Sequence, residues 1–250
     1  MSQPGRVLVH PDKQVLADAA GARLLVALLD ALGEHAGPVH LVLTGGSMGS
    51  AILASLGACP GREALDWSRL HLWWGDERYL PTGDPERNET QNAAALLDAV
   101  PVPAANVHAV PGPDTTASAE ESAQRYAAAL GEAAGAVGGV PDFDLVLLGV
   151  GPDGHIASLF PGHPGLAATG STAAVHHSPK PPPDRVTLTF DALRRGRRVW
   201  FLVAGSDKAD AVRRGTGPTD VDRTPASGVA GTMETLWLVD ADAAADLATP

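Results

Sequence analysis

An aspartate and a histidine lie two residues apart in the segment GVGPDGHIASLFP, residues 149–161. Histidine is the side chain whose unperturbed pKa lets it accept a proton near neutral pH, and a nearby carboxylate can fix its tautomer and stabilise its charged form. Gly151 and Gly154 bracket Asp153, which is typical of a tight turn. We therefore predict that Asp153 and His155 are catalytic, with His155 as a general base.

Glycines at 149, 151 and 154 in the same segment also match G-x-G-x-x-G, the dinucleotide-binding pattern. That pattern needs a helix directly after the glycines and, about 20 residues further on, an acidic residue at the end of a strand. Pro161 and Pro164 would end such a helix early, and no strand of that kind follows. Nucleotide binding is therefore disfavoured.

Two further polar segments follow apolar runs. In TGGS, residues 44–47, the glycines let the backbone approach a ligand, and Ser47 can cap a following helix whose N-terminal amides attract anions. In GDER, residues 75–78, Arg78 offers a planar fork suited to phosphate or carboxylate. A plain capped turn and a surface ion-pair cluster are the respective alternatives.

Apolar strand-like runs alternate with Ala- and Leu-rich helical stretches almost from end to end. We expect strands over residues 7–10, 39–43, 70–74, 143–150, 186–190, 199–204 and 235–239, and helices over 15–32, 88–100 and 118–134. This alternation predicts an α/β fold: a mostly parallel open sheet with helices on both faces, in a single domain over residues 1–250. In such sheets ligands bind beyond the carboxyl ends of the strands, where we expect all three polar segments.

Two other segments carry structural predictions. The proline-rich SPKPPPD, residues 178–184, is rigid and too short for a recognition tail, so we predict a loop over a cleft. The basic run RRGRR, residues 194–198, falls between two predicted strands of an acidic chain. We predict a solvated turn there rather than a basic targeting signal.

The formal charge of −11 argues against a nucleic-acid partner, because binding a phosphate backbone needs a basic face. The one cysteine, Cys59, allows neither an intramolecular disulfide nor a cysteine cage for a metal. The N-terminal segment has no signal-peptide pattern, and no run of about 18 apolar residues could span a bilayer. We expect a soluble, cytoplasmic protein without a membrane partner.

Together the polar segments resemble the glucosamine-6-phosphate isomerase/6-phosphogluconolactonase family, and within it the lactonase branch. The matching features are the Gly-Gly-Ser turn at 45–47, DER at 76–78 and the long run at 149–161, which is the specific one. Further similarity lies in RVTLT at 185–189 and AGSDK at 204–208, so the likeness covers residues 44–210 in order. The resemblance implies a Rossmann-like fold of the sugar-phosphate isomerase/CoA-transferase type.

Two positions separate the branches. After Asp-Gly-His the deaminase branch carries an Asn-Glu-Pro type sequence, whose acidic residue supports proton transfer, whereas this chain has SLFP at 158–161. An aromatic residue normally follows the Asp-Glu pair of deaminases, whereas Arg78 follows it here. Both differences favour a lactonase. An amino-sugar phosphate deaminase or isomerase is one alternative; a non-catalytic sugar-phosphate sensor is another, although we expect no room for a DNA-binding segment before Val7 or after Val239.

The resemblance implies hydrolysis of 6-phospho-D-glucono-1,5-lactone to 6-phospho-D-gluconate in the oxidative pentose phosphate pathway, for which no cofactor or metal is chemically necessary. His155 would take a proton from water, and Asp153 would orient His155 or hold a substrate hydroxyl. One cation would hold the phosphate, and another would face the carbonyl oxygen. The candidate substrate-binding residues are Gly46, Ser47, Asp76, Arg78, Asn88, Gly154, Ser158, Arg185 and Lys208. The expected partner is a phosphorylated sugar lactone, and the expected assembly is a monomer or small homo-oligomer.

Overall fold

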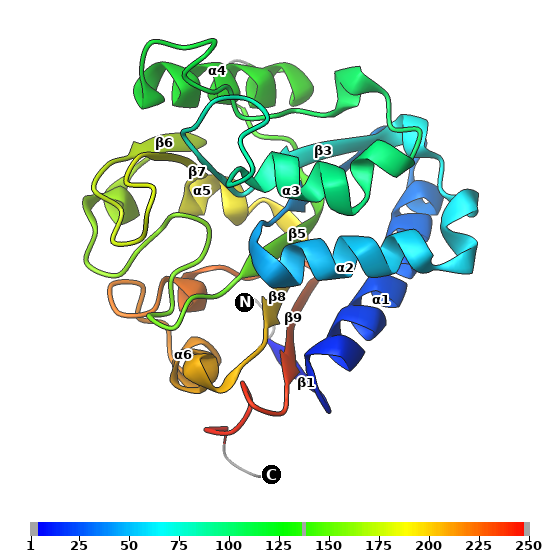
Figure 1. The fold of residues 1–250 in the computed structure, drawn as a ribbon, viewed down its shortest axis with the longest axis vertical. Helices are drawn as coiled ribbons and strands as arrows, with labels where there is room; N and C mark the ends of the chain where they lie inside the picture. The colour runs from blue at the N-terminus through cyan, green and yellow to red at the C-terminus, as the bar shows by residue number, and fades with distance from the viewer. Residues whose placement is uncertain (1–4, 137–138, 248–250) are drawn as a thin grey trace.

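A six-stranded sheet in which every pairing is parallel runs through the centre of the molecule (Figure 1). The computed structural model describes residues 5–136 and 139–247. In spatial order the strands are β1 (Arg6–His10), β9 (Glu234–Asp240), β8 (Gly196–Val203), β5 (Phe143–Gly149), β2 (Val39–Leu43) and β3 (Leu70–Trp74). This architecture confirms the predicted α/β class and the mostly parallel open sheet.

The central strands are near-continuous apolar runs because both faces of the sheet are covered. All of β2 is buried, and it pairs with β3 from Val39 opposite Leu70 to Leu43 opposite Trp74, within the bounds predicted for both strands. From β2 the chain proceeds outward to β3, whereas from β5 it proceeds the other way to β8 and β9. The order therefore reverses between β2 and β5, and open α/β sheets bind ligands at such a point.

Helices cover both faces of this sheet. The long α1 (Lys13–Glu34) and α2 (Gly46–Ala58) pack together on one side, and α6 (Ala209–Gly215) lies on the other side of β8 and β9 (Figure 1). Asp12 begins α1 by accepting a 2.8 Å hydrogen bond from the backbone N–H of Val15. Within the described ranges, no helix has the length and apolar character needed to cross a membrane.

A small antiparallel sheet stands beside the main one. Its order is β4 (Asp76–Arg78), β7 (Arg185–Leu188) and β6 (Thr172–Val175), and α4 (Ala119–Ala133) packs on β6 and β7. The sequence predicted residues 75–78 as a loop and no strand at 172–175, and both predictions were wrong. Hydrogen bonds from β7, distant in the chain from β4, create these strands, so local patterning could not reveal them.

The remaining elements are short. The helix α3 (Asn88–Ala95) ends before the predicted boundary at 100, and α5 (Phe190–Leu193) begins where a strand was predicted to end. Thr189 caps α5 by accepting from the N–H of Ala192 at 3.4 Å. Single 3-10 turns lie at Pro60–Ala64, Trp67–Arg69, Leu97–Ala99, Ala104–Asn106, Pro164–Ala167, Ser206–Lys208 and Pro225–Gly228.

The basic run at 194–198 is only partly a turn. Because β8 begins at Gly196, Arg197 and Arg198 lie in the strand, and they donate to the carboxylate of Glu34 at 2.6 and 2.8 Å. The prediction of a solvated turn over the whole run was therefore wrong. Two of its four arginines instead join the amino end of β8 to the end of α1.

Candidate active site

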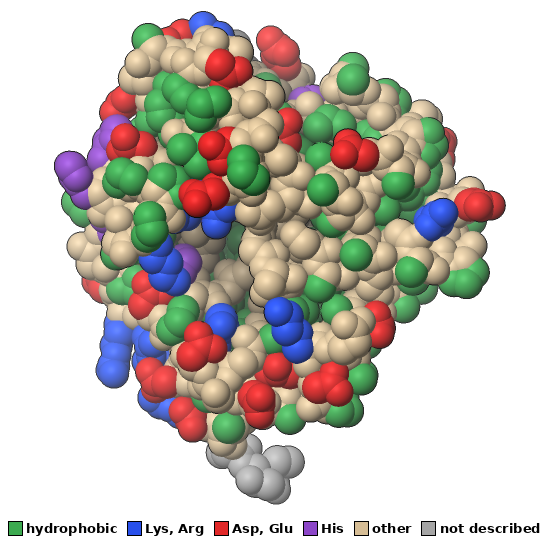
Figure 2. Space-filling view, viewed as in Figure 1, with side chains coloured by type: hydrophobic (Ala, Val, Ile, Leu, Met, Phe, Trp, Pro, Cys, Tyr) green, Lys and Arg blue, Asp and Glu red, His purple; other side chains and the backbone are tan. Residues whose placement is uncertain are grey.

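A cavity of about 360 Å³ opens at the carboxyl ends of β2, β5 and β8. Figure 2 shows a hollow in this face of the molecule, with Lys and Arg side chains around it and a histidine at its edge. The two small-sheet strands β4 and β7 and the proline-rich loop complete the lining. Of the predicted residues, the cavity brings together Gly46, Asp76, Arg78, Asn88, His155, Arg185 and Lys208.

Asp153 and His155 form a hydrogen-bonded pair directly after β5. The Nδ1 atom of His155 lies 2.5 Å from Oδ1 of Asp153, which also accepts from the His155 backbone N–H at 3.3 Å. A carboxylate can only accept, so Nδ1 carries the proton in this contact. His155 lines the cavity, whereas Asp153 lies outside its lining and holds the imidazole from there.

Glycines make this turn possible. The N–H of Gly151 donates to the carbonyl of His155 at 3.0 Å, and a Cβ on Gly151 would lie 2.0 Å from the imidazole ring. Gly154 has a φ of +90°, which L side chains rarely adopt, and a Cβ there would approach Thr224 Cγ2 to 2.9 Å. Gly154 does not line the cavity but turns the chain so that the histidine does.

The Asp153 carboxylate is held in its charged form. Half-burial raises its pKa, but the hydrogen bond and charge of His155, with a further contribution from Lys180, outweigh burial and lower the pKa to about 2. Asp153 is therefore ionised across the neutral range. The His155 side chain is only 14% exposed, and its ring packs on Phe160 with centroids 4.6 Å apart.

Asp76 is fixed from several directions at the cavity wall. Its Oδ2 accepts a 2.6 Å hydrogen bond from Ser158 Oγ and lies 3.7 Å from the guanidinium of Arg185. Asn88 Nδ2 donates to the Asp76 backbone carbonyl at 2.8 Å and approaches its Oδ1 at 3.3 Å. Ser158 is fully buried and does not line the cavity, so its role in the structure is to hold Asp76.

Four cationic side chains line the cavity, and the sequence predicted three of them. Besides Arg78, Arg185 and Lys208, the cavity contains Lys180 from the proline-rich loop. Arg185 anchors that loop by donating to the carbonyl oxygens of residues 180, 181 and 182 at 3.0–3.2 Å. Burial lowers the pKa of Lys180, and the neighbouring charges of Lys208 and Arg185 add to this effect.

The glycine turn after β2 reaches the cavity, but Ser47 does not. Gly45 is the N-cap of α2 and no side chain caps this helix, so the predicted cap by Ser47 was wrong. Ser47 is exposed, and its Oγ accepts from Lys13 Nζ at 3.1 Å, outside the cavity lining. A Cβ on Gly45 would lie 1.7 Å from Asn88 Oδ1, so glycine is required for this close approach.

Two buried charged residues behind the wall were not among the predicted site residues. Glu77 and Arg87 each have side chains only 1% exposed, with Arg87 Nε 3.9 Å from Glu77 Oε2. Burial raises the pKa of Glu77 to about 7 even though Arg87 and three backbone N–H groups lower it. The signal available in the sequence was a charged triplet directly after an apolar strand.

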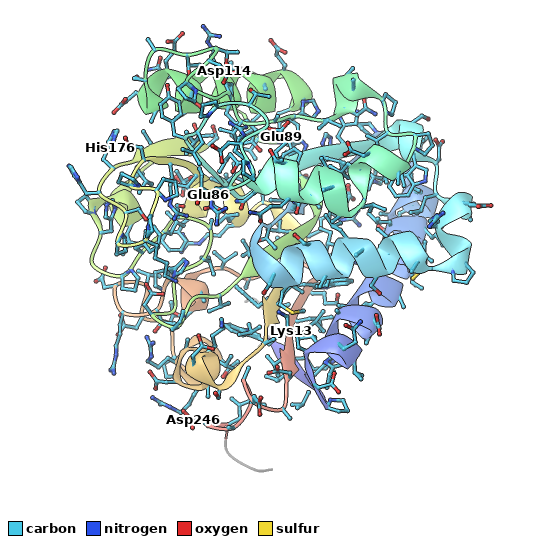
Figure 3. The ribbon with its side chains drawn as sticks, in the orientation of Figure 1. Lys13, Glu86, Glu89, Asp114, His176 and Asp246 are labelled. Atoms are coloured by element: carbon cyan, nitrogen blue, oxygen red, sulfur yellow. The ribbon has the colours of Figure 1, made fainter. Side chains whose placement is uncertain are left out.

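A histidine on the proline-rich loop side of the small sheet faces outward. His176 lies at the outer edge of the molecule in Figure 3, where its ring nitrogens contact Glu120 at 2.6 Å and Asp184 at 2.8 Å. In residues 5–136 and 139–247, no group of three or more His, Cys, Asp or Glu side chains is arranged to hold a metal ion.

Comparison with known proteins matches the chain over nearly its whole length. The family described as glucosamine-6-phosphate isomerases/6-phosphogluconolactonase matches residues 11–237. The protein named 6-phosphogluconolactonase from Streptomyces coelicolor is 49% identical, and the match covers 99% of this chain and 96% of the relative. The protein of the same name from Mycobacterium tuberculosis is 45% identical, and the match covers 96% of this chain and 97% of the relative. The solved structure of 6-phosphogluconolactonase from Trypanosoma brucei has a TM-score of 0.82 at 29% identity, and the match covers 99% of this chain and 100% of that one. The matched residues include every loop that lines the cavity.

Proposed function

Because this chain belongs to the glucosamine-6-phosphate isomerase/6-phosphogluconolactonase family, we propose that it hydrolyses 6-phospho-D-glucono-1,5-lactone to 6-phospho-D-gluconate, in the oxidative pentose phosphate pathway. The names of relatives up to 49% identical support the reaction. The observation that carries the mechanism is the Asp153–His155 pair at a cavity lined by four cations. An anionic sugar ester and a general base would meet there.

In this mechanism His155 is the general base. Its Nε2 takes a proton from water, and the resulting hydroxide adds to the lactone carbonyl carbon to form a tetrahedral oxyanion. When the oxyanion collapses, the bond between that carbon and the ring oxygen breaks. The imidazolium then returns its proton to the ring oxygen, which becomes a hydroxyl group, and the new carboxylic acid ionises in water. Asp153, ionised throughout, keeps the imidazole in the required tautomer.

The cations divide between the two ends of the substrate. The phosphate carries close to two negative charges, and Arg78, Lys180, Arg185 and Lys208 supply compensating charge in an otherwise acidic chain. The backbone at Gly45 and Gly46 adds room for a close approach. One cation faces the carbonyl oxygen, where losing a donor costs about 2.7–4 kcal/mol of transition-state stabilisation.

The test is acid release from freshly generated 6-phosphogluconolactone, followed by pH-stat or by a coupled dehydrogenase, with spontaneous hydrolysis subtracted. The native protein should accelerate hydrolysis, and His155→Ala should lower kcat by roughly 10²- to 10⁴-fold while still binding 6-phosphogluconate. His176→Ala is the matched control, because His176 also contacts carboxylates but lies outside the cavity.

Two results would change the conclusion. Full activity of the His155→Ala variant would remove the histidine from its role as base while leaving the reaction in place. No acceleration by the native protein, together with release of ammonia from glucosamine 6-phosphate, would make the protein a deaminase instead.

A further inference from the structure

The buried carboxylate of Glu77 connects two elements that carry cavity-lining residues. Its Oε1 accepts from the backbone N–H groups of Arg78 at 2.8 Å and Asn88 at 2.7 Å, and its Oε2 accepts from that of Glu89 at 2.8 Å. Arg78 belongs to β4, whereas Asn88 and Glu89 are the first two residues of α3. One side chain thus ties the start of a helix to a strand of the small sheet.

The residues held in this way are the ones whose side chains reach the cavity. Arg78 and Asn88 both line it, and Asn88 also donates to Asp76. Glu77 itself does not line the cavity, and its side chain is 1% exposed. We propose, on the basis of the proposed lactonase function, that Glu77 is a positioning residue: its negative charge holds Arg78 and Asn88 at the substrate.

The stability of the fold does not by itself require an ionised carboxylate at Glu77. Burial raises the pKa of Glu77 to about 7, against the lowering effects of Arg87 and the three N–H groups. Because the pKa of Glu77 is higher in the folded than in the unfolded chain, protonation of Glu77 stabilises the fold. This contribution to stability is fully present below the unfolded-state pKa of 4.5 and is lost as the pH rises through about 7. An ionised Glu77 therefore costs stability at neutral pH, and buried ion pairs are weak evidence for stability in general. Its charge is better explained by the site that it organises.

The surroundings explain how the charge is accommodated. Ionisable groups face Glu77 from each neighbouring element: Arg78 on β4, Arg87 and Glu89 at the start of α3, Arg185 on β7 and Tyr126 on α4. Arg87 is held in turn by Glu89 Oε2 at 2.8 Å and by the carbonyl oxygens of Leu80 and Val110. Protonation of Glu77 would turn one of its two oxygens into a donor and weaken at least one of its three contacts with the N–H groups of Arg78, Asn88 and Glu89.

The experiment compares the native protein with Glu77→Gln, which keeps the shape and removes the charge. At pH 8 the variant should raise the KM for 6-phosphogluconolactone and the Kd for 6-phosphogluconate by about tenfold, with kcat little changed. At pH 6, where native Glu77 is mostly protonated, the KM and Kd values of the native and Glu77→Gln proteins should lie closer together than at pH 8. The phosphate of the ligand also titrates near pH 6, but equally for both proteins.

Glu121→Gln is the matched control. Glu121 likewise accepts from a backbone N–H at a helix start, that of Ala117 at 2.7 Å, but on α4 and outside the cavity lining. It should leave KM and Kd unchanged at both pH values. Native KM and Kd in a folded Glu77→Gln protein would overturn the inference, and so would a loss of equal size at pH 6 and pH 8.

Two further measurements distinguish a failure of this inference from a failure of the proposed function or of folding. If the native protein lacked lactonase activity, the proposed function would be wrong, and the role of Glu77 would be decided by the affinity for 6-phosphogluconate alone. If Glu77→Gln did not fold, hydrogen exchange of the native protein would decide. The reference is the backbone N–H of Glu121, which donates to Ser118 Oγ at 3.3 Å. Relative to that amide, the protection of the Asn88 and Glu89 amides against exchange should be lower at pH 6 than at pH 8. Equal protection at the two pH values would overturn the inference.

Discussion

Ser158 Oγ donates a 2.6 Å hydrogen bond to Oδ2 of Asp76, joining two segments that are 82 residues apart in the chain. Asp76 lines the cavity, whereas Ser158 is fully buried and does not. The contact therefore supports one wall of the cavity from behind. It also explains how a residue of the long motif after β5 can matter to the site without touching a ligand.

Ser158→Ala should lower stability and weaken substrate binding. Removing one partner of a buried hydrogen bond costs about 1–3 kcal/mol, and Asp76 would lose its shortest contact. We expect a raised KM with a smaller change in kcat, measured by urea denaturation and steady-state kinetics. The control is Ser122→Ala, a fully buried serine that donates to the carbonyl of Pro111 at 2.6 Å and lies outside the cavity lining. It should lose stability but keep the native KM; an unchanged KM in both variants would contradict the prediction.

Asp153→Asn should separate the two roles open to Asp153. An amide can donate to Nδ1 of His155, which would move the imidazole proton to Nε2 and abolish the base. If Asp153 orients His155, kcat should fall by roughly 10²- to 10⁴-fold with KM little changed. Steady-state kinetics on the coupled assay checks this. A rise in KM at native kcat would instead assign Asp153 to a substrate hydroxyl.

Lys180→Met should raise the KM for the phosphorylated lactone by about tenfold, equivalent to about 1.4 kcal/mol of binding. Lys180 lines the cavity with three other cations, and its long apolar stem is matched by methionine, so the change removes mainly charge. Calorimetric titration with 6-phosphogluconate measures the loss directly. Lys13→Met, which alters the remaining lysine outside the cavity, should bind normally. Native affinity in Lys180→Met would remove Lys180 from the binding site.

Acid should destabilise the protein through a histidine cluster at β2 and β3. His71 Nδ1 lies 3.0 Å from His108 Nε2, and His40 Nδ1 accepts from the indole N–H of Trp73 at 3.1 Å. Burial, with the charge of His71 adding to it, lowers the pKa of His40 to about 4, and His108 behaves likewise. Because the two histidines have a lower pKa in the folded chain than in the unfolded chain, their neutral forms stabilise the fold. This contribution to stability is fully present above pH 6.5 and is lost as the pH falls toward 4.

Urea denaturation at pH 7.5 and pH 4.5 measures this effect. His40→Gln should flatten the loss of stability between the two pH values by about 2 kcal/mol. His176→Gln, which alters an exposed histidine whose pKa Asp184 and Glu120 raise, should not flatten that loss, because a raised pKa adds stability at the lower pH. Equal pH dependence in the native and His40→Gln proteins would show that the cluster is protonated without penalty.

The parallel sheet was predictable because its strands are defined by their own composition. The strands β2 and β3 occur within the predicted bounds, since runs such as VHLVL and LHLWW can be satisfied only by burial on both faces. The strand β4 was missed because its three residues are charged and its pairing comes from β7. Similarly, nothing local indicates that Arg197 and Arg198 belong to a strand, since their partner Glu34 lies on a distant helix.

The predicted site residues fall into two groups for the same reason. Residues with a strand-end position and a reactive type, such as His155 and Arg78, lie at the cavity because the sheet brings all carboxyl ends to one edge. Ser47 fails because the helix begins two residues earlier than predicted, with Gly45 as its N-cap, which leaves the Ser47 side chain exposed. Lys180 and Glu77 were not predicted, because their roles depend on how a proline-rich loop and a short helix pack on the small sheet.

The pairing of β1 with β9, Arg6 opposite Leu236, has a consequence for biosynthesis. The ribosome makes β1 long before β9, its neighbour in the described part of the sheet, so this strand stays unpaired while the residues between the two are translated. The cavity is completed late as well, because Lys208 emerges long after Gly45. A nascent chain therefore cannot complete the cavity lining before Lys208 has been made, and activity in a cell-free translation reaction should appear only in products that extend beyond Lys208.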